Sequence, residues 1–126
     1  DTTERFARMD AAIAAAQAER PEITAINAAE FVEAQLAMPQ AEGTTRVLMH
    51  SIVWQYVPDD QQARVTAAME AAGGQATPDR ALAWIALEAN RTKLKHELVV
   101  RYWPGNGDPV MLARAHAHGA EIAWLC

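Results

Sequence analysis

The feature that most constrains the fold is the apolar run Arg46-Val47-Leu48-Met49-His50-Ser51-Ile52-Val53-Trp54, the longest in the chain. Its apolar side chains are nearly continuous, not alternating, as is typical of a strand buried on both faces of a parallel sheet. A second run, Leu82 to Glu88, has the same character. Between them lies a predicted helix that begins near Pro58 and ends at Gly73-Gly74. Two buried strands joined by a helix predict a parallel pair with a right-handed crossover.

The segment upstream of this run predicts two helices and a short strand. Asp1 and Glu4 have the spacing of a capping box, and this helix ends before Pro21. The stretch Ile23-Thr24-Ala25-Ile26 alternates as a strand does, and Asn27 opens the next helix. The apolar stripes of the two helices are formed by Phe6, Met9 and Ile13, and by Phe31, Val32 and Leu36.

The C-terminal third predicts an antiparallel meander. Strands are expected over 97–103, 110–116 and 121–125, separated by turns at Pro104-Gly105-Asn106-Gly107-Asp108 and His118-Gly119. We therefore expect one α/β domain over 1–126, a Rossmann-like three-layer fold. Its parallel part spans about 1–90, with an antiparallel hairpin or meander over about 96–126. Because a helix that opens such a layer normally follows a strand, the chain is expected to be the C-terminal portion of a larger domain.

Charge and cysteine content narrow the possible partners and the compartment. The net charge is −5 and Lys and Arg are scattered, whereas nucleic-acid binding requires clustered positive charge. No apolar run approaches the roughly 20 residues of a membrane span. The single cysteine, Cys126, can form no internal disulfide, so a cytoplasmic protein is expected.

The candidate ligand site lies where the predicted parallel strands end, because open α/β sheets bind ligands beyond the carboxyl ends of their strands. This rule selects a group of side chains after the first strand and one after the second: His50, Ser51, Trp54, Gln55 and Tyr56, and Glu88. The indole and phenol rings could line a pocket for a flat small molecule or belong to the core.

His50 and Glu88 are the candidate catalytic residues. If the two strands are neighbours, these side chains lie within reach of each other. A carboxylate fixes the tautomer of an adjacent imidazole and strengthens it as a general base. The alternative is structural: His50 is satisfied by a backbone carbonyl, and Glu88 caps a neighbouring helix or pairs with Arg91.

His116 and His118 are weak candidates for a metal site. They share one face if the strand continues through both, and His96 or Glu121 could add a ligand. A turn at His118-Gly119 would break that face, so a structural use of these histidines is the alternative, and we expect no metal.

Several short motifs give the chain a family resemblance. They are His50-Ser51-Ile52-Val53-Trp54-Gln55-Tyr56-Val57-Pro58, Leu82-Ala83-Trp84 through Glu88, Trp103-Pro104-Gly105, Leu112-Ala113, His116, His118-Gly119 and Trp124. On these residues the chain resembles the C-terminal part of an uncharacterised bacterial family, the domain of unknown function 2332. The resemblance implies a bacterial protein and no particular activity.

The order of the predicted elements is similar to the second half of class I methyltransferase folds. That similarity implies a methyltransferase-like enzyme domain that binds a small molecule. Adenosylmethionine is possible only if a missing N-terminal half supplies the glycine-rich loop, since Gly73-Gly74 ends a helix and does not open one. The alternative function is a non-catalytic module that binds a partner or forms a homodimer, because an exposed edge strand favours pairing with a second chain.

Overall fold

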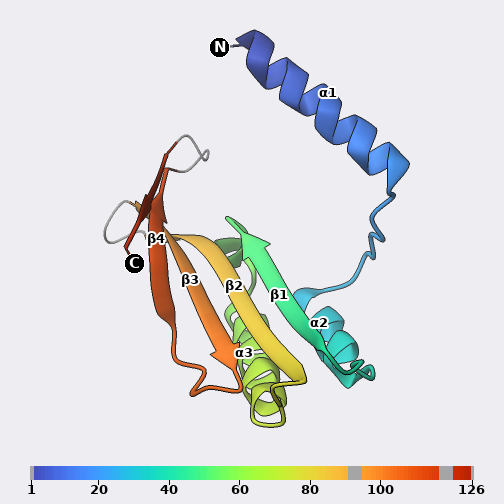
Figure 1. The fold of residues 1–126 in the computed structure, drawn as a ribbon, viewed down its shortest axis with the longest axis vertical. Coiled ribbons are helices and arrows are strands. Elements are labelled where there is room, and N and C mark those ends of the chain that lie inside the picture. Colours follow the sequence, from blue (N-terminus) through green and yellow to red (C-terminus); the bar gives the residue numbers. More distant parts are fainter. Residues whose placement is uncertain (1, 91–94, 117–120, 126) are drawn as a thin grey trace.

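The computed structural model describes residues 2–90, 95–116 and 121–125. It is a mixed α/β fold in which helices pack on a five-stranded sheet (Figure 1). Asp1, Arg91, the predicted turn His118-Gly119 and Cys126 lie outside the described residues. The elements are α1 (Thr2–Ala18), α2 (Ala28–Ala37), β1 (Thr44–Ser51), the 3-10 helix η1 (Trp54–Tyr56), α3 (Asp59–Gly73), β2 (Arg80–Asn90), β3 (Lys95–Trp103), β4 (Val110–Ala115) and β5 (Ile122–Trp124).

The strands follow one another across the sheet in chain order. β1 and β2 are parallel, with Leu48 opposite Trp84, and α3 forms the connection between them. The unit β1–α3–β2 therefore confirms the predicted parallel pair. β2 through β5 pair antiparallel, which confirms the predicted meander.

The prediction of a third parallel strand over Ile23–Ile26 is wrong. These residues have no regular secondary structure, and the side chain of Ile23 is 90% exposed. A strand is stabilised by hydrogen bonds to a neighbour, so an alternating pattern without a paired neighbour is not sufficient. The helix predicted directly after this segment is confirmed, because Asn27 Oδ1 accepts the N–H of Glu30 at the start of α2.

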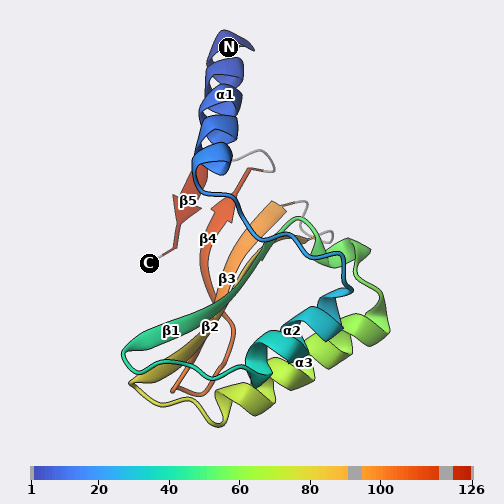
Figure 2. The same ribbon diagram turned by 90° about the vertical axis from the view of Figure 1, so that its right-hand side faces the viewer.

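The described residues form two layers and not the three that were predicted. α2 and α3 lie side by side on the same face of the sheet (Figure 2). Between helices and sheet lies a core to which both helices and two strands, β2 and β3, contribute: Ala29, Val32, Val65, Met69, Leu82, Trp84 and Trp103. The indole of Trp103 packs directly against Gly73 at the end of α3, where an added Cβ would lie 2.5 Å from the ring.

The opposite face of the sheet is apolar and no helix covers it in the part of the chain that the structure describes (Figure 2). Val47 and Met49 of β1 and Tyr102 of β3 are exposed there. Helix α1 stands apart from the sheet and buries none of its residues (Figure 1). Its apolar stripe is therefore exposed to solvent. None of the described helices is both long and apolar enough to cross a membrane.

Candidate functional site

The structure brings together the two residues expected at the ends of the parallel strands. His50 and Glu88 lie on the face of β1 and β2 that carries the helices, with His50 opposite Ala86 in the register. His50 Nδ1 lies 2.7 Å from Glu88 Oε1. Their side chains are only 10% and 19% exposed. The two side chains therefore lie within reach of each other, as expected for neighbouring strands.

The second ring nitrogen of His50 is also occupied. Trp84 Nε1 donates a hydrogen bond to His50 Nε2 at 2.9 Å. An indole N–H can only donate, so Nε2 must be unprotonated and the proton must lie on Nδ1. His50 is therefore a neutral imidazole that donates to Glu88 and accepts from Trp84. With its lone pair engaged by an indole, the ring has no site left at which to take a proton from a substrate.

Glu88 also fixes the chain that follows β1. Its Oε1 accepts the backbone N–H groups of Val53, at 3.1 Å, and of Trp54, at 3.2 Å. These are orphan donors at the start of the short helix η1, so Glu88 acts as its cap. The strand predicted to extend to Trp54 therefore ends at Ser51, and the chain turns into η1.

The turn itself is strained. Ile52 has a φ of 52°, a left-handed conformation that is unusual for a β-branched residue. Such a conformation costs about 1–3 kcal/mol and persists where the surroundings determine it. Here the Ile52 N–H donates to Leu87 O at 2.9 Å, and Glu88 holds the next two amides.

The result of this turn is a cluster of three rings. Trp54 stacks on His50 with centroids 4.8 Å apart and an interplanar angle of 17°. Trp54 also meets Trp84 edge to face at 5.5 Å. His50, Trp54 and Trp84 thus form an aromatic corner on the helix-bearing side of the sheet.

The remaining predicted ligand residues do not lie in this corner. Ser51 is exposed and alternates with His50 along β1, so it belongs to the opposite face. Gln55 is exposed, and Tyr56 is 73% exposed.

The predicted metal pair falls partly outside the described residues. His116 is described and lies directly after β4, whereas His118 is not. Within 2–90, 95–116 and 121–125, no three His, Cys, Asp or Glu side chains are grouped so that they could hold a metal ion.

A groove of about 410 Å³ adjoins the aromatic corner. Its floor is formed by β2 and β3, and α3, η1 and Pro109 border it. The lining residues are Trp54, Thr66, Glu70, Trp84, Ala86, Val99, Arg101 and Pro109. Arg101 is its cation, placed 5.6 Å from the ring centroid of Trp84 and bound through Nη2 to Glu70 Oε1 at 2.9 Å. Arg101 was not predicted as a site residue. A single arginine inside the apolar strand Leu98-Val99-Val100-Arg101-Tyr102-Trp103 could have indicated it.

A family model described as "Uncharacterized protein conserved in bacteria (DUF2332)" matches residues 1–124. The chain belongs to this family. The resemblance expected from the Trp and His-Gly motifs is thereby confirmed. No curated protein and no solved structure matched the chain.

Proposed function

We propose that this DUF2332 domain binds a small planar molecule, without acting on it through His50, in the groove between α3 and β3. The observation that carries this proposal is that two indole rings and one guanidinium border the same open space. Ligand sites typically combine apolar and aromatic walls with a small number of polar groups that fix orientation. The groove has this composition.

The ring of the ligand is expected to lie against Trp54 and Trp84. These indoles meet edge to face, so the corner between them offers both a ring face and a ring edge to a flat molecule. Ala86 and Val99 contribute small apolar side chains to the floor of the groove.

A carboxylate on the ligand is expected to bind Arg101. A guanidinium has five N–H donors in a planar fork that matches a carboxylate. Among the described residues Arg101 meets two acceptors, Glu70 Oε1 and the carbonyl oxygen of Gly107. The Glu70 side chain is 55% exposed, so it can move aside for a ligand at little cost.

In this proposal His50 and Glu88 are positioning residues. Glu88 caps η1 and His50 stacks on Trp54, so together they hold one wall of the groove. This assignment favours the structural alternative for the pair over the general-base hypothesis.

The test is titration of planar aromatic carboxylates, namely benzoate, nicotinate and indole-3-acetate, monitored by ligand-observed NMR. We expect saturable binding that Arg101→Gln weakens at least about tenfold, the order of a lost charge-assisted pair. Arg64→Gln is the matched control, since Arg64 pairs with Glu33 on the surface between α2 and α3. Equal affinity in both variants, or no binding by any probe, would rule out this site.

The methyltransferase-like hypothesis makes a different prediction. It rests on the single parallel unit β1–α3–β2, which many folds share, and on no residue of the groove. Adenosylmethionine added to the same titration separates the two hypotheses: competition with the carboxylates would favour the transferase. The alternative of a dimerisation module is favoured by a separate observation: no strand among the described residues pairs with the outer edge of β1.

A further inference from the structure

The outer edge of β1 offers a row of backbone groups to a further strand. β1 is the first strand of the sheet, and no strand in the described part of the chain pairs with its outer side. Ile52 N–H bonds to Leu87 O of β2, and Gln40 Nε2 bridges the carbonyl oxygens of Thr44 and Ala81. The even-numbered residues thus direct their backbone groups toward β2.

Because successive residues of a strand direct their N–H and C=O groups to opposite sides, the odd-numbered residues of β1 point outward. These residues are Thr45, Val47, Met49 and Ser51. An eight-residue edge with such a row is long enough to template another strand.

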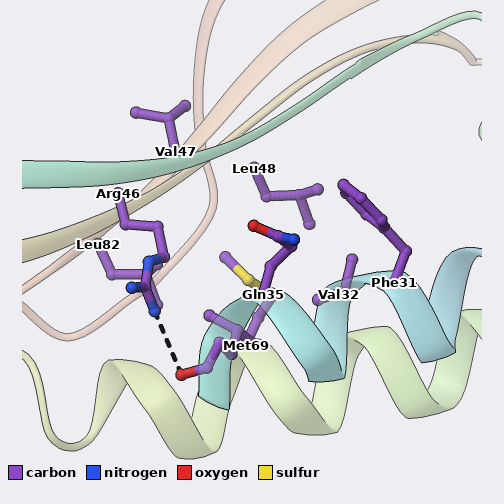
Figure 3. A pocket seen from close by; sticks show the side chains of 9 residues that line it. Phe31, Val32, Gln35, Arg46, Val47, Leu48, Met69 and Leu82 are labelled. Atoms are coloured by element: carbon purple, nitrogen blue, oxygen red, sulfur yellow. Dashed lines mark hydrogen bonds between the residues drawn. The ribbon is translucent and has the colours of Figure 1, made fainter. Parts of the chain in front are cut away.

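A cleft between β1 and α2 lies beside this edge (Figure 3). Its volume is about 210 Å³, and its walls are mainly apolar. Phe31 and Val32 enter it from α2 and Leu48 from β1, and Phe31 is 42% exposed. Arg46 borders one end, held by a hydrogen bond from Nη1 to Leu36 O at 3.2 Å.

A strand added to β1 would therefore need apolar side chains on both of its faces. On the helix side it meets the cleft at Phe31 and Leu48. On the other side it lies beside Val47 and Met49, of which Met49 is 68% exposed. A strand with one polar face would leave one of these surfaces uncovered.

The segment Ile23-Thr24-Ala25-Ile26 meets this requirement. In a strand, Ile23 and Ala25 would lie on one face and Thr24 and Ile26 on the other. Each face thus carries one isoleucine. In the structure this segment is unpaired, and Ile23 is almost fully exposed.

The segment is poorly placed to pair with β1 of its own chain. Only Asn27 separates Ile26 from the first residue of α2, and its side chain already caps that helix. Connections between a strand and the next helix usually need about 2–6 residues. Pairing within the chain would therefore disrupt the cap of α2, whereas pairing with a second copy leaves it intact.

We propose that residues 23–26 of one copy add to the free edge of β1 in a second copy, with Ile23 or Ile26 in the cleft beside α2. Reciprocal addition gives a closed two-fold dimer in which each copy contributes and receives one strand. Main-chain hydrogen bonds supply affinity and the cleft supplies selectivity, as in other strand-addition complexes. The cleft beside β1 is separate from the ligand groove, which lies between α3 and β3.

The test is amide hydrogen exchange by NMR, combined with sedimentation over a range of concentrations. We expect a dimer in which the amides of Thr45, Val47 and Met49 exchange slowly, and fast exchange at these positions on dilution. Ile23→Asp should raise the dimer Kd at least about tenfold, because it replaces an isoleucine that becomes buried when the strand adds to β1. Ile13→Asp is the matched control on α1, where an exposed isoleucine lies outside the pairing segment, and it should leave the Kd unchanged.

A peptide of residues 20–27 provides a second readout that does not depend on a variant. It should dissociate the dimer and slow exchange at the same three amides. A chain that stays monomeric with a fast-exchanging edge would overturn the proposal. So would edge protection that is independent of concentration, which would indicate pairing within one chain. A dimer unaffected by Ile23→Asp would place the interface elsewhere.

Discussion

Trp84 Nε1 donates to His50 Nε2 at 2.9 Å, and this one bond determines what the histidine can do. It fixes the Nδ1–H tautomer and directs that proton to Glu88, 2.7 Å away. A histidine and a glutamate at the ends of neighbouring parallel strands look like a general base and its orienting partner. Because the Trp84 indole occupies Nε2, the pair instead stabilises the turn after β1.

The tautomer of His50 can be observed directly. We expect long-range ¹H–¹⁵N spectra at neutral pH to show a protonated Nδ1 and an unprotonated Nε2. Trp84→Phe removes the donor to Nε2 and should change the Nε2 shift. A wild-type ring protonated on Nε2 would be incompatible with the hydrogen bond from Trp84.

Glu88→Gln should destabilise the domain. The change weakens the acceptor of three donors, two of them backbone amides of the strained turn, and should lower the free energy of unfolding by about 1–3 kcal/mol. Urea unfolding measures this. Glu42→Gln is the control, since Glu42 is an exposed partner of Arg80 and its replacement should change stability by less than about 0.5 kcal/mol. Equal effects of the two changes would show that Glu88 does not hold the turn.

Gly73→Ala should be costly although Gly73 lies in a helix. A Cβ there would meet the Trp103 indole at 2.5 Å, and overpacking of this kind costs about 1–3 kcal/mol. Gly74→Ala is the matched control, because the nearest atom lies 3.5 Å away and the residue has helical dihedrals. A lower melting temperature in the first variant only would confirm the contact, and similar melting temperatures would contradict it.

The bridge between α2 and α3 should make stability depend on pH. The Arg64 side chain donates to Glu33 and lowers the pKa of that carboxyl from its ordinary value of 4.5. A carboxyl whose folded-state pKa is depressed contributes stability above its unfolded pKa and loses it as the pH falls through the folded pKa. Glu33→Gln should therefore be less stable than wild type at pH 7, and the difference should shrink below about pH 4.5. Thermal melts across this range measure it, and a pH-independent difference would argue against the bridge.

Several features of the fold were predictable because they depend on local patterns. The runs at 46–54 and 82–88 predicted the parallel pair, and Asn27 predicted the start of α2. The turn residues after Trp103 predicted the meander. The strand over 23–26 was not realised, because pairing depends on a neighbour that the alternation of side chains does not specify. The end of β1 was also missed, since Ile52 adopts a conformation that its residue type disfavours.

For the candidate site, the sequence placed His50 and Glu88 at the ends of two strands and predicted that they lie within reach of each other if those strands are neighbours. The strand ends could be located from the local pattern, whereas the register that places His50 opposite Ala86 comes from the structure. Their role depends on the tertiary fold, because the partner of His50 Nε2 is a side chain 34 positions away in sequence. The role of Arg101 also depends on the tertiary fold, because α3 and η1 pack over β2 and β3 to form the groove that it lines. Hydrogen-bond donors and cavity walls come from residues distant in sequence, and no periodicity within one segment encodes them.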